Sequence, residues 1–174
     1  MTNDNSTYLR RMTHWPLVMA FIACTILAAF GQKNKETETP PTQKPLNEQA
    51  TADAWDAYNS GKYEAAITNA RLCIDEFRGA ASIMQDKLKK EKANLPTGAV
   101  SDDVKRKIQT NGLLNDVATC YFIEGRSAEK LGRKDQAMKA YERARKYTYA
   151  RTWDTKGWFW SPAEAADGRI EGLR

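Results

Sequence analysis

The sequence predicts an all-α domain of paired helices behind a separate leader, and three observations support this fold class. Apolar and small residues recur with helical spacing over most of residues 48–150. Two isolated glycines, Gly61 and Gly132, interrupt this spacing where short turns would reverse the chain. Residues 1–31 combine basic side chains with an apolar run, as export signals do.

The composition is that of an ordinary soluble domain with a modest core. Of the 174 residues, 41% are hydrophobic and 28% are charged. The net charge of +5 is small and mixed in sign along the chain, so we expect no nucleic-acid binding, which favours a concentrated basic stripe. The only histidine, His14, lies in the leader, and the sequence has no phosphate-binding loop, nucleophile elbow or paired cysteine motif. We therefore expect no enzymatic activity, no metal and no cofactor.

The leader, residues 1–31, has the pattern of a secretory signal or a membrane anchor. An apolar run from Trp15 to Gly31 follows three basic residues, Arg10, Arg11 and His14. The arginine pair would hold the N-terminus in the cytoplasm and send the rest of the chain across the membrane. We therefore expect export, with the domain facing the periplasm of a bacterial cell.

Three outcomes for the leader remain open. It stays as an anchor in the cytoplasmic membrane, it is cleaved before Gln32 to leave a periplasmic protein, or it is lipidated at Cys24. Residues 32–47 are polar and contain three prolines, so we predict a disordered tether between the leader and the domain.

The segment from Tyr121 to Ala144 has the most informative pattern of the domain. Gly132 divides this segment into two halves. Small residues recur where two short antiparallel helices would touch: Gly125, Ala128, Ala137, Ala140 and Ala144. This spacing predicts a tight helical hairpin.

The same segment resembles a tetratricopeptide repeat (TPR), whose signature runs W-x2-L-G-x2-Y, then A-x3-F, then P. Tyr121 stands at the Trp position and Gly125 at the Gly position, while Ala137 and Tyr141 form the A-x3-F pair. Three residues depart from the signature: Glu124 at Leu, Ala128 at Tyr and Tyr149 at Pro. The resemblance implies stacked helix pairs that act as a binding scaffold.

The resemblance extends to a first hairpin that begins near Glu48. Here Gly61 separates the segments ATADAWDAYNS and EAAITNARLCIDEF. The small positions of the family are then occupied by Ala54, Ala66, Ala70 and Cys73. We therefore expect two TPR-like hairpins, one around each glycine.

Two arrangements are possible between the hairpins, whose turns are roughly two repeat lengths of 34 residues apart. One is a degenerate middle repeat, with helix breaks at Gly79 and at Asn111-Gly112 and a turn at 95–100. The other is a pair of long antiparallel helices, Tyr63–Asn94 and Ser101–Leu131, folded about the LPTG turn. We favour the long pair, because apolar residues keep their helical phase through the supposed breaks.

The long pair would bring particular residues of its two helices face to face. Ala81 would lie against Gly112, where small side chains allow a close approach. Cys73 would lie opposite Cys120, and these thiols are either small packing residues or, in an oxidising compartment, a disulfide.

The resemblance also implies a binding groove, because the first helix of each repeat in this family lines a groove that holds a peptide or a partner helix. The corresponding residues here are Thr51, Trp55, Tyr58, Phe122, Arg126 and Glu129. Tryptophan, tyrosine and arginine are enriched in binding hot spots. In the alternative interpretation, Trp55 and Phe122 are buried inside the domain.

A basic cluster surrounds the turn of the long helix pair. Its members are Lys87, Lys89, Lys90, Lys92, Lys105, Arg106 and Lys107. They would attract an anionic membrane surface, an envelope polymer or an acidic partner, or they are simply a solvated surface, because acidic residues interleave with them.

The last segment, residues 151–174, combines aromatic side chains with a helix start. The aromatic residues are Trp153, Trp158, Phe159 and Trp160. Ser161, Pro162 and Glu164 have the spacing of a capped helix N-terminus. We expect a terminal helix that caps the second hairpin and is held there by the aromatics. The alternative is an exposed aromatic patch that contacts a ligand or a membrane.

These features together predict a membrane-tethered, TPR-like scaffold that holds an unidentified protein or peptide in the bacterial cell envelope. The alternative is a structural protein that binds an envelope polymer or an anionic surface through the basic cluster. An enzyme of unknown type ranks third.

Overall fold

The computed structural model describes residues 44–174. This part of the chain contains six α-helices and one two-stranded antiparallel sheet: α1 (Leu46–Asn59), α2 (Tyr63–Lys90), α3 (Asp102–Gln109), α4 (Gly112–Lys130), α5 (Lys134–Ala144), β1 (Thr152–Asp154), β2 (Trp158–Trp160) and α6 (Pro162–Leu173). Most of these residues are helical, so the prediction of an all-α domain is confirmed for the part described.

The leader (residues 1–31) and most of the predicted tether lie outside the described residues, so export, processing and lipidation at Cys24 stay predictions. Among residues 44–174, no helix is both long enough and apolar enough to span a membrane.

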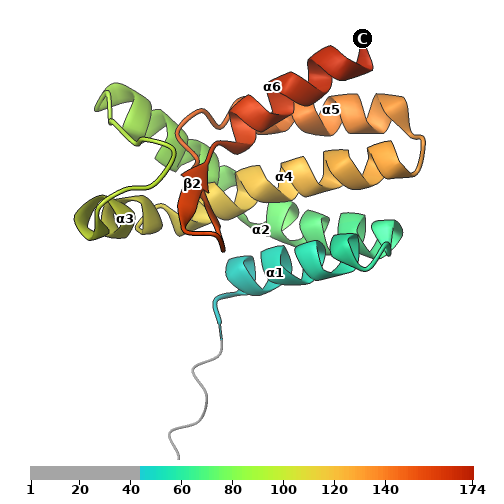
Figure 1. Ribbon diagram of the computed structural model, residues 1–174, viewed down its shortest axis with the longest axis horizontal. Coiled ribbons are helices and arrows are strands. Elements are labelled where there is room, and N and C mark those ends of the chain that lie inside the picture. Colours follow the sequence, from blue (N-terminus) through green and yellow to red (C-terminus); the bar gives the residue numbers. More distant parts are fainter. Residues whose placement is uncertain (1–43) are drawn as a thin grey trace, which may run out of the picture. The chain divides into compact units, whose positions relative to one another are not determined.

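Helix α4 lies between the α1–α2 pair and the α5–α6 pair (Figure 1) and packs against all four of these helices. Buried residues occur on nearly every side of α4, among them Leu114, Val117, Cys120 and Ile123. A helix that is apolar all round is stable only inside a core. The two hairpins therefore share one core, with α4 at its centre.

The turns of the two hairpins have the same backbone geometry. Gly61 and Gly132 have φ angles of +73° and +72°, a region that glycine adopts without steric cost. In both turns the residue after the glycine donates its N–H to the carbonyl five residues earlier, at 2.9 Å. The glycine itself donates to the carbonyl three residues earlier, at 3.0 Å in both turns. This hydrogen bonding ends one helix and starts the next within three residues.

A close approach of α4 and α5 explains the small residues of the second hairpin. Gly125 faces the ring of Tyr141, and a Cβ atom at Gly125 would lie only 2.5 Å from Cε1 of that ring. The neighbouring Ala128, Ala137 and Ala144 are fully buried. The predicted small-residue contact between these helices is therefore present.

Two ion pairs tie the hairpins together. Arg71 of α2 donates to Glu124 of α4 at 2.8 Å. Glu64 and Arg133 pair between the start of α2 and the turn before α5, and Arg133 lowers the pKa of Glu64. The exposed Glu64–Arg133 pair contributes little to stability. Glu124 is largely buried, so its pair with Arg71 is less screened by solvent, and the hairpins also share a packed core.

The region between the hairpins combines parts of both predicted arrangements. Helix α2 runs unbroken through Gly79, as the long helix pair requires. Its second half is held by Ala81, Gln85 and Leu88, which are buried at helical spacing. Gln85 also donates to Thr148 at 2.8 Å and accepts from the Tyr149 amide at 3.1 Å, which fixes α2 to the segment after α5.

The prediction of a single second helix, Ser101–Leu131, is wrong. The chain breaks at Thr110 and Asn111, so that the short helix α3 precedes α4. The break is stabilised by Asn115, whose side chain donates to the Ile108 carbonyl at 3.1 Å and accepts from the Arg151 amide at 2.9 Å. The Ile108 carbonyl also accepts from the Asn111 amide at 3.1 Å, so these hydrogen bonds together fix the end of α3.

The two predicted contacts between the long helices have different outcomes. A Cβ atom at Gly112 would meet no other atom within 4 Å, so the close packing expected at this glycine is absent. Cys73 and Cys120 do lie together, because their sulfurs are 3.9 and 3.2 Å from the Thr51 hydroxyl oxygen. Both thiols are free and buried. The interaction with Cys73, together with burial, raises the pKa of the Cys120 thiol well above its usual range.

The C-terminal segment contains a small sheet that was not predicted from the sequence. In this sheet Trp153 pairs with Phe159, and the turn between the strands contains Gly157 at φ +101°. Phe159 also exchanges two backbone hydrogen bonds with Gly98, at 2.7 and 2.9 Å, which connects the loop before α3 to the C-terminal segment. The alternation of exposed Trp158, buried Phe159 and half-buried Trp160 follows from the two-residue period of a strand.

The terminal helix α6 begins as predicted. The Ser161 hydroxyl accepts from the Glu164 amide at 3.3 Å, and Pro162 occupies the first turn. The helix packs against α5 and α4, with Ala166 and Ile170 buried. It therefore covers the second hairpin, as a capping helix would.

Candidate partner-binding surface

The side chains predicted to line a groove lie along α1 and α4, which are neighbours in the fold. Three of them form a connected, partly exposed group: Trp55 and Tyr58 of α1, and Arg126 of α4. We call these three residues the α1–α4 surface. Its aromatic rings come from successive turns of α1, because residues three apart share one side of a helix.

Arg126 joins the two helices of this surface. Its guanidinium donates to the Tyr58 hydroxyl at 2.7 Å. It also lies 5.3 Å from the centroid of the Tyr58 ring and 5.8 Å from that of Phe122. The rings of Trp55 and Tyr58 meet edge to face at 5.8 Å. These contacts hold rotamer-rich side chains in one arrangement, which lowers the entropy that binding would cost.

Two of the predicted groove residues are buried instead. Thr51 donates to the Asn47 carbonyl at 2.8 Å and points toward the two cysteines. Phe122 packs against Tyr141 and Trp160, with ring centroids 5.8 and 5.2 Å away. Phe122 therefore supports Arg126 from inside the domain. The interpretation that buries both Trp55 and Phe122 holds for Phe122 only, because Trp55 is partly exposed.

Glu129 lies at the other end of α4 and is partly buried. It accepts from the Tyr141 hydroxyl at 2.7 Å, while Arg169 of α6 lies 3.5 Å away. Beside it is a shallow hollow of about 340 Å³, lined by Glu129 and by α6 residues that include Gly168 and Arg169. Arg169 was not among the residues predicted from the sequence, although an arginine on the predicted capping helix was a signal that could have suggested it.

The aromatic residues of the C-terminal segment divide into two kinds. Phe159 is 1% exposed, and Trp160 packs on Phe122, so these two hold the segment on the helices. Trp153 and Trp158 are each 39% exposed. They project from opposite sides of the small sheet, because Trp153 pairs with Phe159 and Trp158 pairs with Asp154. The four aromatics therefore do not form one patch.

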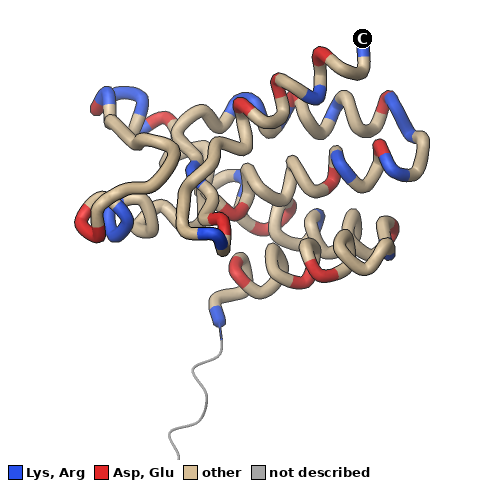
Figure 2. The backbone as a smooth tube through the Cα atoms, in the orientation of Figure 1, with Lys and Arg blue, Asp and Glu red and all other residues tan. Residues whose placement is uncertain are grey.

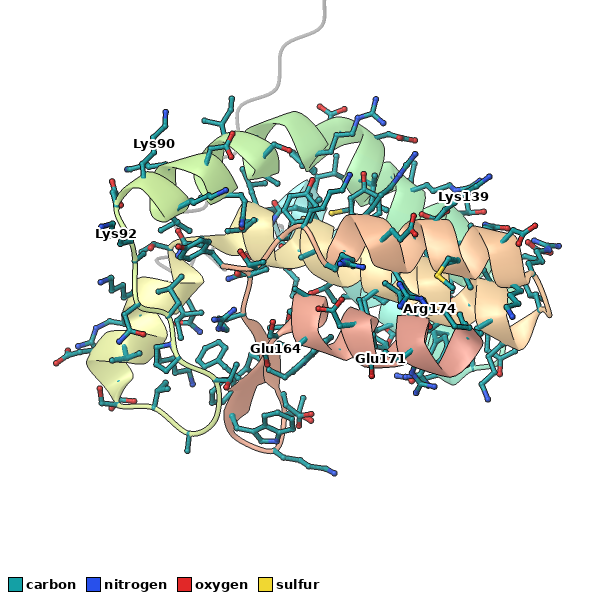
Figure 3. The ribbon with its side chains drawn as sticks, turned by 90° about the horizontal axis from the view of Figure 1, so that it is seen from above. Lys90, Lys92, Lys139, Glu164, Glu171 and Arg174 are labelled. Atoms are coloured by element: carbon teal, nitrogen blue, oxygen red, sulfur yellow. The ribbon has the colours of Figure 1, made fainter. Side chains whose placement is uncertain are left out.

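The basic cluster lies at the end of α2 and on α3, where acidic residues intervene (Figure 2). Lys87 is 4.0 Å from Glu91, and Arg106 pairs with Asp103. Lys105 lies over the Trp153 ring, 3.9 Å from its centroid. Lys90 and Lys92 project outward from the end of α2 (Figure 3).

A partly buried carboxyl lies near the start of α1. Asp116 of α4 accepts a hydrogen bond from the Asn47 side chain. Burial raises the pKa of Asp116 to about 6; the hydrogen bond from Asn47 opposes this rise and the charge of Glu48 adds to it. Among residues 44–174, no group of three His, Cys, Asp or Glu side chains is placed to hold a metal ion.

This pKa predicts how stability depends on pH. The folded protein binds the Asp116 proton more tightly than the unfolded chain, in which the pKa of Asp is about 3.9. Ionisation of Asp116 therefore lowers the free energy of unfolding. This loss of stability is absent below about pH 4 and is complete above about pH 6. We expect Asp116→Asn to raise the free energy of unfolding at pH 7 by about 1–3 kcal/mol and to flatten its decline between about pH 4 and 7.

Urea unfolding at several pH values measures this effect. Asp86→Asn, which removes an exposed carboxylate from α2, is the matched control. An Asp116→Asn protein whose stability declines with pH as steeply as the wild type would contradict the prediction.

Comparison with known proteins finds no matching family model, no similar curated protein and no similar solved structure. The function of the chain is therefore inferred from the residues and geometry described above.

Proposed function

We propose that residues 44–174 form a TPR-like, non-catalytic module that binds a protein or peptide across the α1–α4 surface. The observation that supports this most strongly is the identical turn geometry at Gly61 and Gly132. Equivalent turns make α1 and α4 the equivalent first helices of two hairpins. In TPR proteins these are the helices that line the binding groove.

The chemistry of the surface supports the same proposal. Trp55, Tyr58 and Arg126 are of the residue types that dominate binding energy at interfaces. Each is partly exposed and is held by contacts within the domain. A partner with an extended or helical segment that presents an acidic side chain to Arg126 and an apolar side chain to Trp55 would suit this surface.

The proposed setting is the bacterial cell envelope. The leader (residues 1–31) would export the domain, and the segment between the leader and α1 would tether it to the cytoplasmic membrane if the leader is retained. A partner would then be held at the periplasmic side of that membrane.

The basic cluster supports a second candidate function, binding to an anionic surface or envelope polymer. Within residues 44–174, five lysines of the cluster have no carboxylate within salt-bridge distance: Lys89, Lys90, Lys92, Lys105 and Lys107. Free lysines of this kind attract anionic lipid at about 1 kcal/mol each near a membrane surface.

Affinity capture from envelope extract distinguishes the two candidates. The full chain with Trp55→Ala and Arg126→Ala is compared with a chain in which Lys89, Lys90 and Lys92 are replaced by glutamate. We expect the first variant to retain less than about a tenth of the captured partner, since hot-spot residues contribute about 2 kcal/mol or more each. The second variant should retain it.

Melting curves of both variants control for loss of the fold. Loss of partners only in the lysine variant would refute the α1–α4 surface and favour the anionic-surface function.

A further inference from the structure

A second, chemically different site lies between α2 and the end of α5. It is a cavity of about 630 Å³, with walls from α2, from Tyr121 of α4 and from the segment Arg143–Tyr147. Gly79 forms part of the α2 wall, and a Cβ atom there would meet no other atom within 4 Å. Glycine inside a helix costs about 1 kcal/mol relative to alanine. The missing side chain at Gly79 leaves this part of the cavity open.

The cavity carries a concentration of positive charge. Three basic side chains line it, Arg78, Arg143 and Lys146, against a single acid, Asp86. Arg78 has only an exposed partner, Asp75, at 3.5 Å. Within residues 44–174, neither Arg143 nor Lys146 has a carboxylate within salt-bridge distance. The cations are therefore available to an anion from outside.

Hydroxyl groups complete the lining. Tyr121 and Tyr147 stack with ring centroids 5.9 Å apart, and the Ser82 hydroxyl lies 3.4 Å from that of Tyr147. Burial is the main cause of the raised pKa of Tyr121, so its phenol keeps its proton at neutral pH and can donate it. Within the described residues, no acceptor for the Tyr121 hydroxyl is found. A ligand with several acceptor oxygens would use these donors.

We propose that this cavity binds a phosphoryl group. A phosphoryl group carries up to two negative charges and three acceptor oxygens, and guanidinium groups bind it in bidentate geometry. A carboxylate would use fewer of the donors. The group could belong to a soluble phosphate ester or to a phospholipid headgroup, and the experiment below separates these sources. The site shares no residue with the α1–α4 surface, so it does not depend on the proposed function.

The test follows amide shifts of Gly79, Ser82 and Tyr121 in the full chain, kept in neutral detergent, during titration with inorganic phosphate at constant ionic strength. Acetate is the reference anion. We expect saturable shifts with phosphate and none with acetate. Arg143→Gln and Lys146→Gln should each weaken binding by at least about tenfold, because each removes a charge-assisted hydrogen bond.

Two matched variants exclude simpler explanations. Lys134→Gln removes the same charge from the exposed start of α5, away from the cavity, and should change the affinity by less than about twofold, because exposed charges are screened by salt. Gly79→Leu fills the cavity but keeps every charge, and it should weaken binding at least tenfold in a protein no less stable than the wild type, because leucine favours helices by roughly 0.8 kcal/mol over glycine.

Glycerol phosphate and vesicles of phosphatidylcholine, with and without phosphatidylglycerol, identify the source of the group. A response to glycerol phosphate assigns a soluble ester, and a response only to phosphatidylglycerol vesicles assigns a lipid headgroup. The proposal is overturned if no phosphoryl compound shifts these amides, if acetate acts equally, or if Gly79→Leu binds like the wild type. In those cases Arg143 and Lys146 only complement the C-terminal dipole of α5.

Discussion

Replacement of Phe159 by alanine is expected to destabilise the domain by about 3–5 kcal/mol. Phe159 is 1% exposed, and its ring contacts Trp153 with centroids 4.9 Å apart. Its backbone also pairs with Gly98 on the loop before α3. Loss of the ring would leave a cavity where the C-terminal segment, the α2–α3 loop and the core meet.

Trp158→Ala is the matched control, because it removes a larger ring from the adjacent position. Trp158 is 39% exposed and lies on the opposite side of the small sheet. We expect it to cost less than about 1 kcal/mol. Urea unfolding followed by circular dichroism measures both values. Equal costs for the two variants would mean that the C-terminal segment is not anchored through Phe159.

Gly125 is expected to be the least replaceable glycine of the domain. In Gly125→Ala, the new methyl group would lie 2.5–2.9 Å from three atoms of the buried Tyr141 ring. That ring cannot move freely, because its hydroxyl is bonded to Glu129 at 2.7 Å. Overpacking of this kind costs about 1–3 kcal/mol, which exceeds the gain in helix propensity from glycine to alanine of about 1 kcal/mol.

Gly79→Ala makes the same chemical change in α2, where the methyl group meets no other atom within 4 Å. It should raise the free energy of unfolding by up to about 1 kcal/mol. The two variants share this gain, so they are expected to differ by the overpacking cost of roughly 1–3 kcal/mol in urea unfolding. If Gly125→Ala is as stable as Gly79→Ala, then α4 and α5 are not in the close contact described.

Features of the fold that depend on neighbouring residues were predictable from the sequence. The turns at Gly61 and Gly132 are of this kind, because a lone glycine between two helical patterns determines both ends locally. The start of α6 is another, since Ser161 and Pro162 form a cap without help from the rest of the chain.

Features that depend on distant residues were not predictable. The break between α3 and α4 was one of two predicted alternatives, and helical phase favoured the unbroken helix. The break is stabilised by the hydrogen bond between Asn115 and Arg151, which is far along the chain. The small sheet depends on the pairing of Phe159 with Gly98, which only the folded chain brings together. Helical phase alone could not have indicated either.

The candidate surface was predictable to the extent that it follows from helix periodicity. Trp55, Tyr58 and Arg126 are partly exposed on α1 and α4, and the three-residue spacing of Trp55 and Tyr58 puts them on one side of α1. The hydrogen bond from Arg126 to Tyr58 and the support from Trp160 required the fold. Thr51 shares the spacing of the exposed residues but is buried, because α2 and α4 both approach α1 at that position and bring Cys73 and Cys120 against it.

The most direct measurement for the proposed function is photo-crosslinking of the full chain in its native host. A photoreactive amino acid is placed at Asn59, an exposed residue one turn beyond Trp55 on α1, or at Ile83, which is 72% exposed on α2. We predict a discrete protein adduct from position 59 that disappears when Arg126 is replaced by alanine, and no adduct from position 83. Adducts from position 83 but not from position 59, or a position-59 adduct that persists without Arg126, would contradict binding across this surface.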